Sequence, residues 1–419
     1  MTAAERVEAA LRGGRPDRVP FVPKIWVDFS ARFCGVPLRE VIENPVAALE
    51  VILRAGRGLG LDGVRQFALP ARRTVEAGGR LWEVDGRGRR IGAIDLAGGL
   101  HTLVASAGDF RLDDPVNMAH FHHRRPPGPA LTKTADAAAI AVPDARLLDD
   151  LGFQRNQAEA LGRTPADGMA VIQDCGPIGL SFLVALNGMN QALLDFLDQP
   201  RLVHAALDAG DAIAIAKGSY WLDRGYRTLR INDSAGNLSV ISPDHWRTFV
   251  KPHFASVVSE LHRRCPDALL YCHVCGNVLP IIGDLADTGL DCIAPLDPLG
   301  GFSVADARRA LAQHSAAHTR DARHAAPAAG RPVALMGGIN TLSFVDGTPE
   351  AVGAEAEACI AGARTAADRG ETVLDAVPAG FILGSGCVVP RGARVECLLR
   401  ARDVAHACGQ GSRNGAPSG

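Results

Sequence analysis

Short apolar segments recur along the chain, and each is followed by a longer stretch in which apolar residues repeat at helical spacing. This alternation is typical of parallel βα units, whose strands are covered by helices on both faces. Eight such units predict an α/β fold that is a single (β/α)8 TIM barrel. The predicted strands are Val19–Trp26, Gly63–Phe67, Met169–Asp174, Thr228–Asp233, Leu269–Val274, Cys292–Leu296, Val333–Met336 and Phe381–Gly384.

The pattern changes between the second and third predicted strands. Arg73–Val104 holds short alternating runs separated by glycine-rich turns, which predicts a β-hairpin or meander inserted into the barrel. His120–Pro129 is basic and rich in proline, so it predicts a surface lid loop. We therefore expect residues 1–408 to form one decorated barrel, with an insertion at about 73–130, and residues 409–419 to be a disordered tail.

The charge balance excludes two classes of partner. The 419 residues include 44 Lys and Arg against 46 Asp and Glu, which gives a net charge of −2. Binding to nucleic acid or to an anionic membrane needs basic residues gathered on one face, so we expect neither partner. The longest uncharged run, Cys175–Leu194, contains proline, serine, asparagine and glutamine and is too polar to cross hydrocarbon.

Ten cysteines are spread through the chain without the dense spacing of a disulfide framework. The first twenty residues alternate charged residues with Ala and Leu, and they lack the basic and then apolar order of a signal peptide. Both features indicate reduced thiols in the cytoplasm.

The most informative motif is Tyr271-Cys-His-Val-Cys-Gly-Asn277, at the end of a predicted strand. Residues two apart on a strand face the same side, so His273 and Cys275 project together while Cys272 and Val274 face the other way. An imidazole and a thiolate are two ligands for an ion such as zinc. Gly276 then lets the chain turn out of the strand.

A third ligand is needed, and Cys387 follows the last predicted strand after a Gly-Ser-Gly turn. Parallel barrel strands all end at one mouth, so Cys275 and Cys387 can meet there although they lie far apart in sequence. His273, Cys275 and Cys387 would then hold zinc with a fourth position open for substrate, as in a catalytic site. The alternative is that these cysteines are small core residues, and we expect the other eight cysteines to be packing or surface residues.

Four further polar residues lie at predicted strand ends or within them. Asp233 is a candidate catalytic residue that accepts a proton or orients substrate, and its alternative role is to cap the following loop. Asn232 and Asp174 are candidates for binding substrate, and Asp174 is also a candidate fourth ligand or partner of His273. Lys24 is a candidate partner of an anionic substrate group, or else a lysine at the rim of the barrel.

The sequence also resembles a known family from residue 3 to about residue 405. It is similar to the uroporphyrinogen decarboxylase superfamily, and within it to the zinc-dependent corrinoid-linked methyltransferases, typified by methylcobamide:coenzyme M methyltransferases. The segments that carry the resemblance occur in the family's order: ERVEAALRGGRPDRVP, CGPIGLSFLVALNG, INDSAGNLSVISPDHWRTFVKPHF, LLYCHVCGN with DLADTGLDCIAPLD, MGGINT and FILGSGCVVPRGA.

The resemblance implies a single (β/α)8 barrel. In the methyltransferase branch a His-x-Cys pair and a distant cysteine are zinc ligands, which implies that role for His273, Cys275 and Cys387. Two departures limit the transfer. The N-terminal segment offers only Lys24 and Arg32, a poor match for the eight carboxylates of uroporphyrinogen. The corrinoid-binding signature Asp-x-His-x-x-Gly is absent, and nothing in the sequence identifies coenzyme M.

These observations favour a zinc-dependent methyltransferase that moves a methyl group between a corrinoid and a thiol or a small methylated substrate. Zinc suits this chemistry because it deprotonates a bound thiol near neutral pH. The corrinoid, as methylcobalamin, would be supplied by a separate partner protein, and the direction of transfer and a homodimer stay open. The alternatives are a decarboxylase or lyase acting on a small substrate, and a non-catalytic zinc-stabilised partner of a corrinoid protein.

Overall fold

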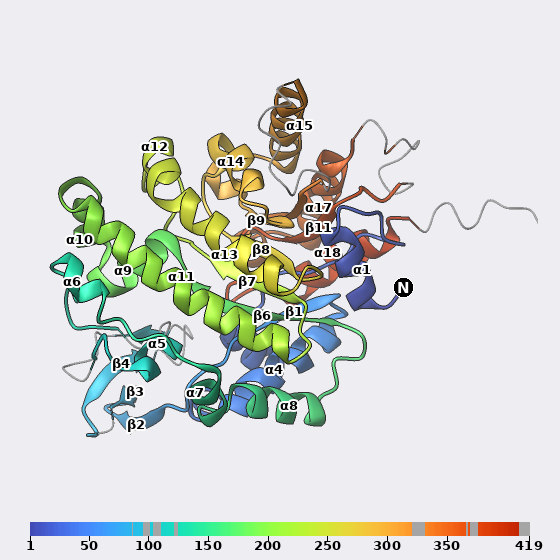
Figure 1. The fold of residues 1–419 in the computed structure, drawn as a ribbon. Helices are drawn as coiled ribbons and strands as arrows, with labels where there is room; N and C mark the ends of the chain where they lie inside the picture. The colour runs from blue at the N-terminus through green and yellow to red at the C-terminus, as the bar shows by residue number, and fades with distance from the viewer. Residues whose placement is uncertain are drawn as a thin grey trace, which may run out of the picture.

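The computed structural model describes residues 1–85, 87–94, 101–103, 110–120, 125–320, 332–365, 368 and 376–409. Helices and strands alternate through most of this length (Figure 1). The described helices are, in chain order, α1 (Ala3–Leu11), α2 (Val27–Phe33), α3 (Leu38–Glu43), α4 (Pro45–Leu59), α5 (Pro115–Ala119), α6 (Thr134–Ala137), α7 (Ala145–Asp150), α8 (Phe153–Arg163), α9 (Gly179–Asn187), α10 (Met189–Asp198), α11 (Pro200–Asp223), α12 (Pro243–His245), α13 (Lys251–Arg264), α14 (Ile282–Asp287), α15 (Val304–Arg320), α16 (Ser343–Asp346), α17 (Pro349–Ala363) and α18 (Val395–Ala407).

A curled, seven-stranded parallel sheet forms the centre of the fold, as in a TIM-like barrel. Its strands pair in chain order, so each βα unit places the next strand beside the previous one. Seven of the eight predicted strands are therefore present. They are β1 (Gly63–Gln66), β6 (Ala170–Pro177), β7 (Thr228–Asn232), β8 (Leu269–His273), β9 (Cys292–Leu296), β10 (Ala334–Ile339) and β11 (Phe381–Ser385).

The remaining predicted strand, Val19–Trp26, is not a regular strand, so a complete eight-stranded barrel is not confirmed. This segment pairs with the chain around β11 only through two isolated bridges, Phe21 to Leu383 and Lys24 to Val388. On its other side, the carbonyl oxygen of Phe21 accepts a hydrogen bond from the residue before β1. Pro20 and Pro23 have no backbone N–H, so the segment cannot continue a ladder of strand hydrogen bonds.

Two apolar cores lie on the two faces of the parallel sheet. The inner core is formed by alternate strand residues, such as Leu269 and Tyr271 of β8, together with Val7 and Leu11 of α1. Helix α1 contacts β1, β6, β10 and β11, and its N-terminal backbone bonds to Gly168, just before β6. It therefore closes the end of the sheet at which the strands begin, and the opposite end, where the strands finish, is left for a site.

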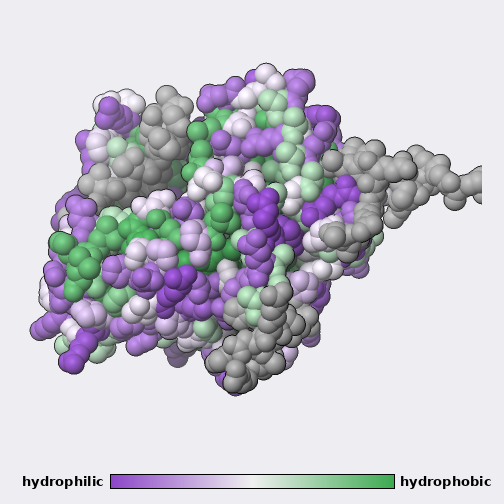
Figure 2. All heavy atoms as spheres, turned by 90° about the horizontal axis from the view of Figure 1, so that it is seen from above, coloured by the Kyte–Doolittle hydropathy of each residue, from purple (hydrophilic) through white to green (hydrophobic). Residues whose placement is uncertain are grey.

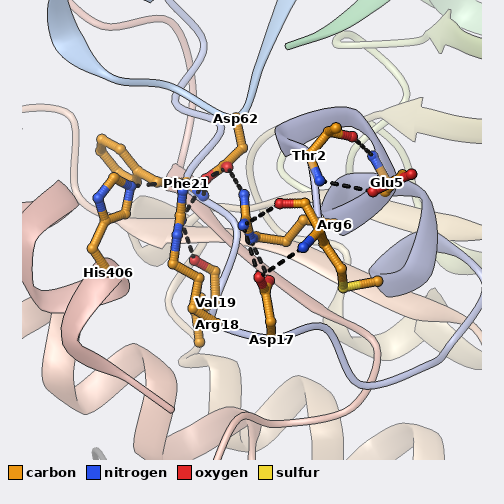
Figure 3. A network of polar contacts seen from close by, with 10 residues as sticks. Thr2, Glu5, Arg6, Asp17, Arg18, Val19, Phe21, Asp62 and His406 are labelled. Carbon is orange, nitrogen blue, oxygen red and sulfur yellow. Dashed lines mark hydrogen bonds and ion pairs between the residues drawn. The ribbon is translucent and has the colours of Figure 1, made fainter. Parts of the chain in front are cut away.

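A buried carboxylate fastens the N-terminal segment to the sheet (Figure 3). Asp62 is fully buried and precedes β1, and its oxygens accept hydrogen bonds from Arg6 at 2.7 Å and from Arg18 at 2.8 and 2.9 Å. The backbone N–H of Phe21 donates to the same carboxylate at 2.9 Å. Arg6 also binds Asp17, so one network joins α1, the loop after it and the segment that enters the sheet.

A second, antiparallel sheet lies between β1 and β6 in the sequence, within the region of the predicted insertion. Its strands pair in the order β2 (Arg73–Ala77), β3 (Arg80–Val84), β4 (Arg90–Ile94) and β5 (His101–Leu103). It lies at the lower left of Figure 1, beside α5 and α7. Of the predicted lid loop, residues 121–124 lie outside the described residues, and so do residues 410–419 of the predicted tail.

Among the described helices, none by itself has both the length and the apolar composition needed to cross a membrane. Helices α9 and α10 meet that test only as a pair, and they are bent by 113° at the break between them. Figure 2 shows apolar side chains gathered toward the left of the molecule, the side on which Figure 1 places these two helices. Met189, Leu194 and Leu197 of α10 are exposed.

We predict that Asp62→Ala lowers the free energy of unfolding by about 3–5 kcal/mol, because the substitution leaves buried arginine charge without its partner. Urea denaturation of the two proteins measures this difference. The matched control is Arg12→Ala, which removes an exposed ion pair with Glu8 within α1 and should cost less than about 1 kcal/mol. Equal losses in the two variants would contradict the role given to Asp62.

Candidate metal centre

The ends of β8 and β11 bring three metal-ligating side chains together. The ligand atoms of His273, Cys275 and Cys387 all lie within 4.8 Å of one another. His273 is the last residue of β8, and the alternation along that strand is as predicted, because Cys272 and Val274 pack in the outer core. Cys387 lies two residues beyond β11. The three predicted ligands are therefore grouped at the end of the sheet opposite α1.

Two loops hold the cysteines in place. Gly276 has a φ of 88°, a left-handed conformation that suits glycine, and its N–H donates to Asp297 at 3.1 Å. Asp297 also accepts from the N–H of Leu299, so it ties the loop after β8 to the loop after β9. In the loop after β11, the hydroxyl of Ser385 donates to the carbonyl oxygen of Cys387 at 2.5 Å. These contacts fix the backbone on both sides of the three ligands.

Lys24 lies against the histidine of this group. Its ammonium nitrogen is 2.9 Å from Nε2 of His273, and its side chain is buried. The backbone N–H of Lys24 donates to the hydroxyl of Ser385, which fixes the lysine beside β11. Burial and the nearby Arg230 lower the pKa of Lys24 well below its ordinary value. Burial, Lys24 and Arg230 likewise lower the pKa of His273, so its imidazole is neutral and able to act as a ligand.

The two thiols differ in their readiness to ionise. A hydrogen bond with Cys275 and the charge of Lys24 lower the pKa of Cys387 to about 6. The same hydrogen bond, together with burial, raises the pKa of Cys275. The two thiols therefore titrate as one coupled pair, which loses its first proton more readily than an isolated thiol does.

The donor set fits zinc. One neutral imidazole and two cysteine sulfurs are ligands that zinc prefers, and three protein ligands leave a fourth position for substrate. The side chains come from rigid strand ends, and one of the two sulfurs already ionises easily. His273, Cys275 and Cys387 are therefore the residues that would hold the ion.

A cleft of about 310 Å³ opens beside these residues. Lys24 and Val388, the neighbour of Cys387, form the wall that it shares with the metal centre. Arg230 of β7 also lines the cleft, and its guanidinium donates to Asp174 at 2.5 Å and also to Asn232. The cleft is lined by Lys24, Trp26, Asp28, Phe67, Arg230, Asn232, Ser234 and Val388.

The predicted substrate-binding residues are thus divided between two places. Lys24 and Asn232 line the cleft, whereas Asp174 borders a smaller cavity together with Lys217. Asp174 is not in the group of metal-ligating residues, and its carboxylate pairs with Arg230. Because Arg230 binds both Asp174 and Asn232, it connects the two cavities.

Asp233, the predicted catalytic residue, is placed elsewhere. It is fully buried and accepts hydrogen bonds from the N–H groups of Leu180, Ser181 and Gly236. It therefore caps the N-terminus of α9, and its bond with Gly236 also ties the loop that follows it, as in its alternative role. Burial raises its pKa to about 7. Asp233 is not among the residues that line the cleft, so a catalytic role for it stays a prediction.

Sequence reasoning missed Arg230 and Arg65. Both are buried in strands, and Arg65 donates to the hydroxyl of Tyr271 at 2.5 Å in the interior of the sheet. A signal was available, because a charged residue inside an apolar strand such as Thr228–Asn232 is costly to bury unless it is paired. Arg230 also shares the strand face of Asn232, which is two residues away.

The fold and the centre define a TIM-barrel-like α/β protein with a candidate His-Cys-Cys metal site where the strands finish. The sequence profile of the family described as Uroporphyrinogen decarboxylase (URO-D) matches residues 124–408, more than half of the chain. The chain belongs to this family.

Two relatives are similar to this chain. A methylated-thiol–coenzyme M methyltransferase of Methanosarcina mazei is 28% identical over 95 residues, which span 23% of this chain and about a quarter (24%) of that protein. The solved structure of a methyltransferase from Methanosarcina mazei covers 97% of this chain and 98% of its own, with a TM-score of 0.64 and 18% identity. At that identity the structural likeness shows a shared fold.

We predict that Cys387→Ala loses bound zinc, because two remaining ligands do not hold the ion. Metal analysis by mass spectrometry should find about one zinc per chain in the unaltered protein and less than about a tenth of that in the variant. The matched control is Cys272→Ala, since Cys272 is also at the end of β8 but packs in the outer core. Full zinc retention in Cys387→Ala would exclude the three-ligand centre.

A second prediction concerns the lysine. Lys24→Met should raise the affinity for zinc about tenfold or more, because the side-chain nitrogen of Lys24 no longer competes with the ion for Nε2 of His273. Competition with a chromophoric chelator measures the affinity, and Lys133→Met, at an exposed position, is the control. Weaker binding in Lys24→Met would instead mean that the lysine supports the ligand geometry.

Proposed function

We propose that this protein is a zinc-dependent methyltransferase that moves a methyl group between a corrinoid and a thiol or a small methylated substrate. The observation that carries the proposal is the convergence of His273, Cys275 and Cys387 beside a cleft. Membership of the URO-D family and the similarity to a methylated-thiol–coenzyme M methyltransferase support it. In this proposal a separate protein supplies the corrinoid.

Zinc bound here would lower the pKa of a substrate thiol, so that the thiolate nucleophile is present near neutral pH. His273, Cys275 and Cys387 hold the ion, and the cleft admits the substrate on the side of Lys24 and Val388.

The walls of the cleft favour an anionic or polarised substrate. Arg230 is a buried cationic side chain, and among the ion pairs of the described residues it pairs only with the carboxylate of Asp174. Lys24 adds a buried amine that can donate hydrogen bonds to a substrate. Trp26 and Phe67 supply apolar cover, with their ring centroids 4.3 Å apart. Exclusion of water by these rings would strengthen every charged contact in the cleft.

A decarboxylase or lyase acting on a small substrate is the second candidate, because the family as a whole is described as uroporphyrinogen decarboxylase. The cationic residues of the cleft also suit a carboxylated substrate. In that reaction zinc would polarise a carbonyl oxygen.

We predict that the zinc-loaded protein forms a methyl thioether from methylcobalamin and at least one member of a panel of small thiols. Cys387→Ala should lower this rate at least about 100-fold, which corresponds to the loss of about 3 kcal/mol of metal assistance. Cys272→Ala should keep most of the activity. Product formation is measured by mass spectrometry.

Three outcomes distinguish the candidates. Release of carbon dioxide from a carboxylated substrate, without thioether formation, would favour the decarboxylase. Tight binding of methylcobalamin without turnover of either substrate class would favour a non-catalytic partner of a corrinoid protein. Equal rates for Cys387→Ala and the unaltered protein would contradict any role of the metal centre in the reaction.

A further inference from the structure

A second group of metal-ligating side chains lies between two helices, outside the site described above. Helices α11 and α13 run side by side in front of the strands in Figure 1, and they contact each other along their length. Asp208 and Asp211 are three residues apart on α11, so they share one face of that helix, and His253 faces them from α13. The ligand atoms of these three residues lie within 4.8 Å of one another.

His253 lies close to the buried Asp211 and farther from the exposed Asp208. Nδ1 of His253 is 2.8 Å from an oxygen of Asp211 and 3.7 Å from an oxygen of Asp208. The ring of His253 is held by stacking on His204, with ring centroids 5.8 Å apart. Asp208 is 76% exposed, so the group can be reached from solvent through this carboxylate.

Two buried polar atoms in the group lack a partner. Asp211 and His253 are each only 5% exposed. Oδ1 of Asp211 makes no hydrogen bond within the described part of the chain, and neither does Nε2 of His253, although the nitrogen of that ring which faces the carboxylates is Nδ1. A buried carboxylate oxygen without a donor costs free energy, so Asp211 is left incompletely satisfied by the protein alone.

The negative charge around Asp211 also favours the binding of a cation. Burial raises the pKa of Asp211 to about 6, and the charged groups that act on it are His253 and Asp208. Lysine and arginine are absent from that set. Two carboxylates therefore gather negative charge in the group, and a divalent ion would neutralise it.

We propose that Asp208, Asp211 and His253 form a second metal site, which binds a divalent transition ion such as Mn²⁺ or Zn²⁺ and cross-links helices α11 and α13. The ligand types decide the class of ion. Carboxylates suit Mn²⁺ and imidazole suits Zn²⁺, and the group has no sulfur ligand. Water completes the coordination on the exposed side of Asp208.

The test uses Mn²⁺ as the probe on the full chain already loaded with zinc, because carboxylates bind Mn²⁺ well and thiolates discriminate against it. The electron paramagnetic resonance signal of free Mn²⁺ measures binding, and we expect one Mn²⁺ per chain. Mn²⁺ should also raise the melting temperature of the unaltered protein, since it binds only the folded state.

Asp208→Asn should weaken Mn²⁺ binding at least about tenfold and abolish the shift in melting temperature. This position is exposed, so the variant should fold normally. Asp198→Asn makes the same charge change at an exposed residue at the end of the neighbouring α10 and should bind Mn²⁺ like the unaltered protein. His253→Gln, a change on the other helix, should also weaken binding.

Two results would overturn the proposal. One is the absence of bound Mn²⁺, together with no second zinc per chain when Zn²⁺ is added in excess. The other is binding that is unchanged in both Asp208→Asn and His253→Gln. Because the readouts are stoichiometry and melting temperature, they are independent of the proposed methyl transfer.

Discussion

The buried carboxylate of Asp62 holds together the part of the molecule on which the metal centre depends. It neutralises Arg6 and Arg18 and accepts the N–H of Phe21, so the segment after α1 is fixed against the start of β1. Three residues further on, the same segment delivers Lys24 to His273. Two prolines prevent this segment from forming a regular strand, and the ion-paired network replaces the hydrogen bonds that a strand would have made.

The centre is built under opposing electrostatic demands. Burial, together with Lys24 and Arg230, lowers the pKa of His273 and keeps the imidazole neutral. The hydrogen bond with Cys275, together with Lys24, lowers the pKa of Cys387 and favours a thiolate. Both are the protonation states that a metal ion requires of its ligands. The lysine beside Nε2 of His273 must nevertheless give way when the site is loaded. The cationic Arg230 in the wall of the cleft suits a substrate that is either an anionic thiol or a carboxylate.

The two groups of metal-ligating residues differ in a way that follows from their positions. The inner group uses one imidazole and two sulfurs at rigid strand ends beside a cleft. The outer group uses two carboxylates and one imidazole between helices, with one ligand open to solvent. Reaction chemistry fits the inner position, where substrate can reach a fourth coordination site. The outer position fits an ion that stabilises helix packing, because its ligands come from two helices, α11 and α13, that contact each other.

Local patterns in the sequence determined the strands and the faces of their side chains, because period-two alternation and apolar runs depend only on neighbouring residues. These patterns were enough to predict that His273 and Cys272 face opposite sides of the strand. They also predicted that Cys387 lies at the same end of the sheet as His273. They were not enough for Val19–Trp26, where prolines interrupt an apolar run. They were also not enough for Asp233, two of whose partners lie more than 50 residues away in α9. The contact between Lys24 and His273 spans 249 positions in the sequence. Arg230 of β7 binds Asn232 of its own strand and also Asp174 of the neighbouring strand β6. Such contacts are set by the curl and pairing order of the sheet, so only the tertiary structure decided them.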